Sequence, residues 1–463
     1  MRAADVLLGA VIALAAFLAY FHSPIQKMGD SEFTVLLSEQ IATEGSFELD
    51  AYFWPNQPVR FFPGMKPGMR WPRQVQPGGV RRAERSGVTE GPLFYIYPHG
   101  TSLLSIPIVL ATRAVGFTTV AADGAYDPAA ERRVQRIAAS LLIALAAALL
   151  FTAARQVLGR GSSAAVALSA AFATQLWSTA SRSLQSHTWT VVLLSLVCLA
   201  LTRRAAREAA PGRSVPHGVW VGTLLSWCFL VRPTAVFFIV PLTVYVLARE
   251  RRAGVAAIAT GLAWLAAFFG YSQAVFGTWL PDYYTRGSGF EAGGYLTGLA
   301  GQLVSPSRGL FVLVPLSLGV AYLVARYRRH LPLRPLCAAA VVCVVLHTAT
   351  MASFRNWWGG HGFGARFSTD LVPLFALLGA LGLAARAAAS PSARTRRLEN
   401  TALVAAALVG ALLNGAGAIS TGGEEWNRVP VPIGEDPDRC FDWTRSQPVC
   451  ALLPDRLPER KPR

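Results

Sequence analysis

Charged residues are scarce in this sequence: they make up 15% of the 463 residues, while 53% are hydrophobic. Acidic residues are the rarer sign, with 26 Asp and Glu against 43 Lys and Arg. Ala138–Ala154, Ser163–Trp177 and Thr401–Ser420 are free of charge, and each approaches the roughly 17–25 residues that cross a bilayer. This composition excludes an intrinsically disordered chain and an ordinary soluble enzyme. The apolar runs are continuous rather than alternating, which excludes a membrane β-barrel.

Cysteine is rare as well, with six residues and no CxxC pair. Because histidines are not clustered either, no motif for a metal is present, and a divalent cation as cofactor is left open. Four cysteines fall in apolar runs, where Cys acts as a small hydrophobe: Cys198, Cys228, Cys337 and Cys343. Cys440 and Cys450 lie in the C-terminal tail, where an oxidising exterior would favour a disulfide between them over two free thiols.

The apolar runs predict an all-α polytopic membrane protein with about 11 transmembrane helices. The expected crossings are Val6–Phe21, Ile137–Ala154, Ser163–Trp177, Thr188–Leu201, His217–Val231, Thr234–Ala248, Val255–Phe276, Gly309–Ala325, Leu336–Ser353, Leu371–Ala385 and Thr401–Ser420. One more apolar segment, Thr101–Gly116, is interrupted by Pro107 and Arg113, and we expect an interfacial or re-entrant helix there.

The net charge of +17 has a sidedness that suits a membrane protein rather than a nucleic-acid partner. With Thr101–Gly116 in the interface, nearly all the excess arginine falls in loops on one face, which is the positive-inside pattern. This predicts a cytoplasmic N-terminus, an outer C-terminus and a location in the cell (inner or plasma) membrane.

Four regions are expected from this topology. Residues 1–22 form a first transmembrane helix that acts as a signal anchor. Residues 23–135 form a long outer loop with juxtamembrane helices. Residues 136–420 form a bundle of about ten helices, and residues 421–463 form an outer tail. The inner loops are short, and the chain contains no Gly-rich phosphate loop or nucleophile elbow, so chemistry is expected at the outer boundary.

Asp30 is the leading candidate for a catalytic residue. It follows the first crossing in the run Lys27-Met28-Gly29-Asp30-Ser31, where proximity to the apolar boundary could raise the pKa of its carboxyl and suit a general base. Asp30 also stands before a helix expected from Phe33 onwards, so the alternative is a simple N-cap.

The other candidates are polar or aromatic residues expected at the same boundary, and each has an ordinary structural alternative. Outer arginines offer a planar fork to a phosphate, although single arginines also snorkel at helix ends. Histidines can act as bases or donors or have no role, and Trp rings can stack on a sugar or belong to an aromatic belt. The candidates for substrate binding are His99, Arg182, His187, Arg232, Arg308, Trp358, His361 and Arg366.

The order of these landmarks resembles the GT-C superfamily of membrane glycosyltransferases, which includes protein O-mannosyltransferases and aminoarabinose transferases. Met28-Gly29-Asp30-Ser31 looks like its first-loop signature, and Tyr97-Pro98-His99-Gly100-Thr101 looks like its interfacial segment. The resemblance spans most of Met1–Leu201. Relatives often place a second carboxylate in the turn where this chain has His187, preceded by Arg182, so metal use and substrate class are open.

The resemblance implies a hexosyl or pentosyl transferase that uses a polyprenyl-phosphate-linked sugar as donor and a glycan, lipid or protein as acceptor. Asp30 would accept the proton of the attacking hydroxyl, and arginines would stabilise the phosphate that leaves, with inversion at the anomeric carbon. The alternative is a transporter or flippase of lipid-linked sugars, which predicts polar residues near the bilayer midplane and paired broken helices.

Overall fold

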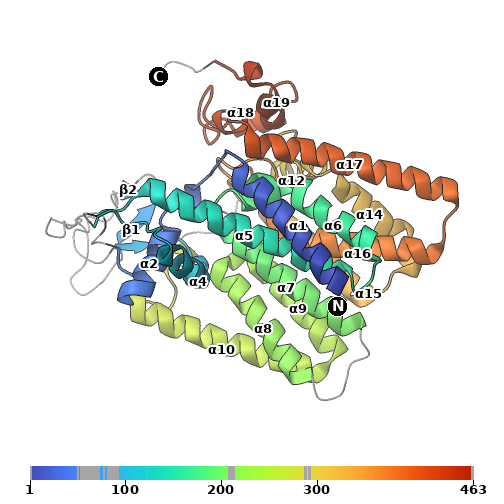
Figure 1. The fold of residues 1–463 in the computed structure, drawn as a ribbon, viewed down its shortest axis with the longest axis horizontal. Helices are drawn as coiled ribbons and strands as arrows, with labels where there is room; N and C mark the ends of the chain where they lie inside the picture. Colours follow the sequence, from blue (N-terminus) through green and yellow to red (C-terminus); the bar gives the residue numbers. More distant parts are fainter. Residues whose placement is uncertain are drawn as a thin grey trace.

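The computed structural model describes residues 3–49, 52, 73–76, 79–80, 93–122, 124–206, 214–285, 289 and 294–459. Most of them are helical, and Figure 1 shows the long helices packed side by side in one bundle. The chain is a helical polytopic membrane protein, as the apolar runs predict.

Within the described residues, eight helices are long and apolar enough to cross a membrane. They are α1 (Ala3–His22), α5 (Pro128–Ala154), α7 (Ser186–Ala206), α8 (Ser214–Val231), α10 (Arg251–Phe276), α15 (Arg334–Ala352), α16 (Val372–Ala389) with the turn η6 (Arg366–Leu371) before it, and α17 (Ala393–Ile419). The count of about 11 transmembrane helices is therefore not confirmed.

The other three expected crossings are interrupted. Ser163–Trp177 divides into α6 (Arg160–Phe172) and the π-helical turn η2 (Leu176–Ala180). Thr234–Ala248 becomes η3 (Pro233–Ala235) and α9 (Val236–Arg249). Gly309–Ala325 breaks into α13 (Leu310–Leu313) and α14 (Leu316–Arg326), because Pro315 between them has no N–H to continue the helix.

The segment expected at the interface forms α4 (Gly100–Ala114). Figure 1 shows α4 nearly end-on while α1, α5 and α10 run across the view, so α4 lies across the direction of the long helices. A Cβ on Gly100 would lie 2.4 Å from Leu230 O, so α4 begins in direct contact with the backbone of α8. The interfacial position of α4 remains a prediction.

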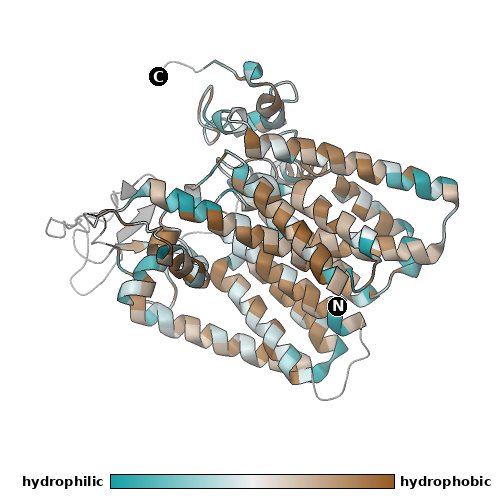
Figure 2. Cartoon of the chain, in the orientation of Figure 1, coloured by the Kyte–Doolittle hydropathy of each residue, from teal (hydrophilic) through white to brown (hydrophobic). Residues whose placement is uncertain are grey.

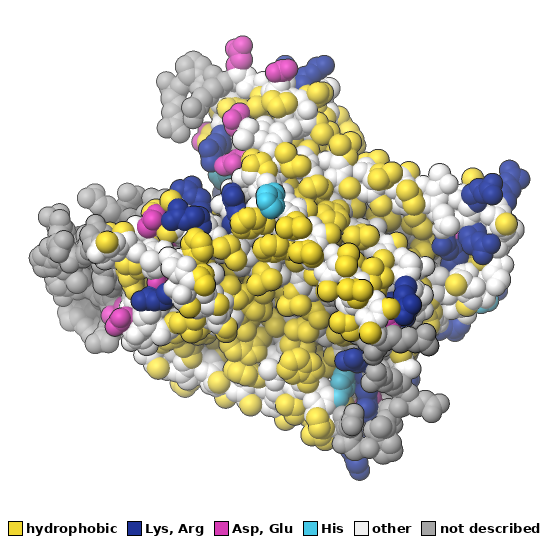
Figure 3. Space-filling view, in the orientation of Figure 1, with side chains coloured by type: hydrophobic (Ala, Val, Ile, Leu, Met, Phe, Trp, Pro, Cys, Tyr) yellow, Lys and Arg dark blue, Asp and Glu magenta, His cyan; other side chains and the backbone are white. Residues whose placement is uncertain are grey.

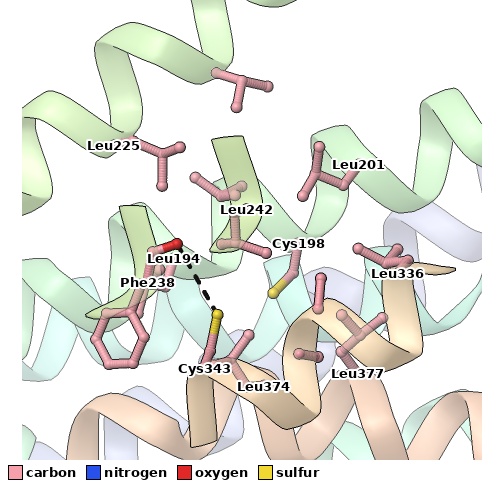
Figure 4. Packing of buried hydrophobic residues seen from close by; sticks show 14 of the residues in the cluster. Leu194, Cys198, Leu201, Leu225, Phe238, Leu242, Leu336, Cys343, Leu374 and Leu377 are labelled. Atoms are coloured by element: carbon pink, nitrogen blue, oxygen red, sulfur yellow. Dashed lines mark hydrogen bonds between the residues drawn. The ribbon is translucent and has the colours of Figure 1, made fainter. Parts of the chain in front are cut away.

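Leucines and cysteines fill the core of the bundle between α7, α8, α9, α15 and α16. Figure 4 shows the side chains of this cluster interleaved, with the Cys343 thiol donating to Phe238 O at 3.9 Å. Cys198, Cys228, Cys337 and Cys343 are all buried free thiols in helices, the environment that the sequence predicts.

The outer surface of the bundle is apolar between two polar ends. Figure 2 shows hydrophobic residues along the middle of the helices and hydrophilic ones at their ends. In Figure 3 hydrophobic side chains cover the middle of the visible face, and Lys and Arg gather at the ends, including the end where α16 and α17 meet. This band is the surface that a bilayer would cover.

The loop between α1 and α5 carries η1 (Gly29–Ser31), α2 (Thr34–Glu44) and a small sheet that the sequence analysis missed. The sheet has the order β2-β1-β3, from β1 (Arg73–Gln76), β2 (Gly79–Val80) and β3 (Leu93–Tyr95). The buried Glu39 of α2 accepts hydrogen bonds from Arg113 and from Thr119 N, which ties α2 to the end of α4.

The C-terminal segment is folded against the same end of the bundle as this loop. It contains α18 (Gly422–Glu425), η7 (Pro437–Phe441), α19 (Gln447–Leu452) and η8 (Pro454–Arg456). Cys440 and Cys450 are buried in one cluster with Trp426 and Ile433, and both are free thiols. The expected disulfide is thus not formed in this structure, where the Cys450 thiol donates to Arg445 O, and the disulfide remains a prediction.

The remaining helices are short: α11 (Asp282–Thr285), α12 (Tyr295–Val304) and η5 (Arg328–His330). Of these, α11 and α12 are the next helices after α10 in the chain, and they lie at the end of the bundle that carries η1. We call this end, with η1, the loop 359–364 and the C-terminal segment, the Asp30 end.

Candidate functional site

Asp30 is held in place by α5. Ser31 Oγ donates to Gln135 Oε1 at 2.7 Å, and Gln135 Nε2 donates back to Ser31 O at 2.7 Å. The buried Glu131, one turn earlier on α5, accepts from the backbone N–H groups of Phe33 and Val35. Glu131 therefore satisfies the first amides of α2, and the alternative in which Asp30 is merely its N-cap is wrong.

The side chain of Asp30 forms an ion pair with Arg366. Its Oδ2 accepts from Arg366 Nη2, and its Oδ1 accepts from the Tyr97 hydroxyl at 3.2 Å. The hydroxyl of Tyr95 donates to the backbone carbonyl of Asp30. Because the Asp30 side chain is still 44% exposed, its carboxylate can be reached from outside the protein.

The pKa of the Asp30 carboxyl lies below its usual value, contrary to the expectation from its place near the apolar boundary. Burial alone would raise this pKa, but the charge of Arg366 and the hydrogen bonds from Arg366 and Tyr97 lower it by more. Asp30 is therefore ionised at neutral pH.

Arg366 follows a glycine-rich loop, 359–364, that folds back over its side chain. Gly359, Gly360 and Gly364 have positive φ angles of 73°, 63° and 60°, which glycine adopts without strain. A Cβ on Gly362 would lie 2.6 Å from Arg366 Cδ. Arg366 Nη1 donates to Gly359 O at 3.1 Å, so the loop aims the guanidinium at Asp30.

A second charged group lies behind this pair, between α7 and η6. The buried Asp370 accepts from His187 Nδ1 at 2.8 Å and forms an ion pair with Arg232 at 2.8 Å. Arg232 also donates to Ser186 Oγ at 3.0 Å. His187 and Arg232 were predicted, but Asp370 was not, although an acid at the start of an apolar run is itself a signal for function.

Lys27 is the second residue that sequence reasoning missed. Its ammonium is buried and has no hydrogen-bond acceptor among the described residues, and it lies 5.5 Å from the centre of the Phe363 ring. Burial, followed by the charges of Arg308 and Arg366, lowers the pKa of Lys27 to about 7, although Glu424 acts in the opposite direction. A buried cation without an acceptor is an open position for an anion.

An aromatic cavity of about 280 Å³ adjoins Asp30. Tyr97, which donates to Asp30, lines it together with Tyr283. His99 lies in the wall of this cavity, where its ring stacks on Phe47 and bonds to Tyr95 O and the Tyr271 hydroxyl. The cavity is lined by apolar and aromatic residues of β3, α4, α8, α10 and α11, including Trp227, Trp264, Phe268, Tyr271, Phe276 and Tyr284, and by Phe47 after α2.

Two predicted arginines have structural partners instead of facing open space. Arg308 is buried, and its guanidinium donates to Gly362 O, Gly360 O, Gln447 Oε1 and Asn427 Oδ1. Arg182 is buried too, and it donates to Tyr20 O, Ser23 O and Ile25 O, where α1 ends. Both side chains hold backbone in place, and neither presents a free fork to a ligand.

The contacts of Trp358 and His361 are also with parts of the protein other than Asp30. Trp358 is buried in the cluster with Trp357, Trp426 and Cys440, which makes it part of the packing under the C-terminal segment. His361 is exposed, and its carbonyl accepts from Asn427. Of the predicted residues, the structure thus brings together Asp30 and Arg366, with His187 and Arg232 behind them and His99 in the cavity wall.

No cluster of three or more His, Cys, Asp and Glu side chains that could hold a metal is found in the part of the chain that the structure describes. Asp30 and Asp370 are each already paired with an arginine.

The fold is similar to that of two solved GT-C glycosyltransferases. ArnT from Cupriavidus metallidurans, solved with undecaprenyl phosphate, matches with a TM-score of 0.51 and 15% identity over 93% of this chain and 70% of that one. The oligosaccharyltransferase of Archaeoglobus fulgidus, solved with a tethered acceptor peptide that contains an NVT sequon, matches with a TM-score of 0.50 and 12% identity. That match covers 95% of this chain and 59% of the other.

Residues 130–276, about a third of the chain, match the family model described as dolichyl-phosphate-mannose-protein mannosyltransferase. No curated protein sequence matches the chain. The fold and this family match confirm the resemblance to the GT-C superfamily that the order of motifs indicates.

Proposed function

We propose that this protein is an integral membrane glycosyltransferase that moves a sugar from a polyprenyl-phosphate donor to an acceptor at the Asp30 end of the bundle, on the outer face of the membrane. The observation that carries the proposal is the group formed by Asp30, Arg366 and Lys27, which Tyr97 connects to an aromatic cavity. The family match and the GT-C fold support the same class of reaction.

The charges of the site suit a sugar phosphodiester. Asp30 balances Arg366, Asp370 balances Arg232, and the Lys27 ammonium has no hydrogen-bond partner in the part of the chain that the structure describes. Arg366 Nε is buried and has no acceptor within the described residues. Lys27 and Arg366 would therefore bind the single negative charge of the donor phosphate, while the lipid chain enters the aromatic cavity.

The reaction then needs one base and one stabilised leaving group. The acceptor hydroxyl attacks the anomeric carbon, its proton passes to the Asp30 carboxylate, and the bond between the anomeric carbon and the phosphate oxygen breaks. The polyprenyl phosphate leaves with the bonding electrons, and Lys27 and Arg366 stabilise the added negative charge. A single displacement inverts the anomeric centre.

Asp30 has to be released from Arg366 for this role. An ion pair to arginine makes the carboxylate a weak base in the resting protein, because it lowers the pKa of Asp30. Donor phosphate would compete for the guanidinium of Arg366, which weakens the pair and raises the basicity of Asp30. Binding of the donor would thus activate the base.

Product analysis tests the proposal. Membranes that contain the protein would be incubated with a panel of labelled polyprenyl-phosphate sugars, and the anomeric configuration of any product would be determined by NMR. We expect transfer from at least one donor with inverted configuration. Transfer with retained configuration would contradict the single displacement, and hydrolysis or translocation without transfer would contradict the glycosyltransferase.

A further inference from the structure

The aromatic cavity next to Asp30 adjoins a groove between α8, α9 and α10. The groove has a volume of about 380 Å³ and is lined almost entirely by apolar side chains. Leu230, Trp264 and Phe268 line both the cavity and the groove. The two spaces therefore share one wall, and together they extend away from the Asp30 site along α10. We call the two spaces together the path.

Two glycines of α8 explain where α8 and α10 approach each other closely. A Cβ on Gly218 would lie 2.1 Å from Ala253 O, and one on Gly222 would lie 2.6 Å from Ala257 O, so the two backbones touch there. Towards the Asp30 end, α4 packs onto α8, and Figure 1 shows α8 and α10 spreading apart in that direction. The groove begins beside this contact, because Gly222 and Ala257 also line it, and its other side is formed by α9.

The rim of the groove faces outward. It carries apolar side chains of α9 and α10 that are between 39% and 62% exposed: Val240, Val244, Ile258, Leu262 and Leu265. Because α10 is long and apolar enough to cross a membrane, these side chains would lie in the hydrocarbon of the bilayer. A hydrocarbon chain could enter the groove sideways, without crossing a polar surface.

We propose that this path sets the chain-length preference for the lipid carrier. This inference depends on the proposed function. The first isoprene units occupy the cavity and the groove, and the rest of the chain stays in the bilayer. From Tyr271 in the cavity to Ala257 in the groove, α10 rises about 20 Å, roughly the length of four extended isoprene units. Affinity should grow up to about that length, because protein walls pack against a chain more closely than fluid lipid does. It should then level off, because further units stay in the bilayer.

Gly261 offers a substitution that would block the path without a clash. It lines the groove, and a Cβ there would have only Ser226 Oγ within 4 Å, at 3.9 Å. Gly261→Leu should therefore fill part of the groove. Gly270, on the same helix, lines neither space, and a Cβ there would have no neighbour within 4 Å. Gly270→Leu is the matched control.

The experiment measures binding of geranyl phosphate and of undecaprenyl phosphate to the purified full-length protein in nanodiscs. The unaltered protein and the Gly270→Leu protein should bind the long lipid at least roughly tenfold more tightly than the short one. The Gly261→Leu protein should lose most of this preference while its affinity for geranyl phosphate is kept.

Each outcome separates this inference from the function on which it depends. A Gly261→Leu protein that keeps the full preference for the long lipid would overturn the path and leave the proposed function standing. An unaltered protein that binds no polyprenyl phosphate of either length would overturn the proposed function, and the path with it.

Discussion

Asp30 and Arg366 are 336 positions apart in the chain, and their side chains form an ion pair at one end of the bundle. Asp30 comes from the turn after α1, and Arg366 from the turn before α16. The pair thus joins the first loop to the last third of the bundle. It also explains why the carboxylate stays ionised at neutral pH although an apolar cavity adjoins it.

Replacement of Asp30 by Asn should abolish transfer and leave the protein folded. Asn keeps the shape of the side chain but cannot accept a proton at neutral pH, and loss of a general base typically lowers the rate by about 10²–10⁴. The rate of sugar transfer by membranes is the measurement. Asp127→Asn is the matched control, because Asp127 caps α5 and Asn is an equally good cap. Near-normal transfer by the Asp30→Asn protein would remove Asp30 as the base.

Lys27 should make phosphate binding depend on pH. Because the pKa of Lys27 is lowered to about 7 in the free protein, its positive charge is present below that pH and lost above it. Affinity for undecaprenyl phosphate should therefore fall, by roughly tenfold, as pH rises from about 6 to 8.5. The Lys27→Arg protein should not lose affinity over the same range, since Arg does not titrate there.

The phosphate of the ligand also titrates near pH 6, with the opposite effect, because a more negative phosphate binds a cation more tightly. The Lys27→Arg protein measures this contribution alone. If the unaltered protein and the Lys27→Arg protein had the same pH profile, Lys27 would have no part in binding the phosphate.

Arg308 should affect stability, because four oxygen acceptors surround its guanidinium. Arg308→Met would remove the donor of Gly360 O and Asn427 Oδ1, while Gly362 O and Gln447 Oε1 keep other donors. The loss should lower the free energy of unfolding by about 1–3 kcal/mol. Hydrogen exchange of the amides of α18 and α19 would detect the loosening. Arg428→Met is the control, because Arg428 is exposed and its ion pair is with the nearby Glu424 on the surface. Unchanged exchange in the Arg308→Met protein would contradict the structural role.

The orientation in the membrane can be tested by cysteine labelling. The native cysteines are buried, so an introduced thiol would react first. We expect an impermeant maleimide added to intact cells to label Thr444→Cys and to leave Ala206→Cys unlabelled, because the arginine-rich loops should lie inside. Both positions are exposed in the structure. Labelling of Ala206→Cys alone would invert the topology and move the site to the other face.

The sequence predicted the features that depend only on neighbouring residues in the chain. Continuous apolar runs predict the long helices, because a bilayer leaves few alternatives to a helix of about 20 residues. Interruptions were harder to foresee. Pro315 breaks one expected crossing, and three short strands form in the first loop where no alternating pattern was recognised.

For the site, the types of residue could be predicted from the sequence, but the contacts of their side chains could not. An arginine at the boundary has the same appearance in sequence whether it faces a ligand or backbone carbonyls, so Arg308 and Arg366 could not be told apart. Lys27 was overlooked because its buried ammonium matters only for having no acceptor among the described residues, which the packing alone reveals. Asp370 belongs to a buried group with His187 and Arg232 that joins segments far apart in the chain.

Gln447 bonds to the loop that precedes Arg366 at two places: its Oε1 accepts from Gly364 N at 2.9 Å, and its Nε2 donates to Gly362 O at 3.0 Å. The same Oε1 accepts from Arg308. During synthesis Gln447 leaves the ribosome after every helix of the bundle has been made. A nascent chain would therefore insert with Asp30 already in position but with the arginine loop not yet fastened, and a segment translated after the whole bundle would fix Arg366 beside Asp30.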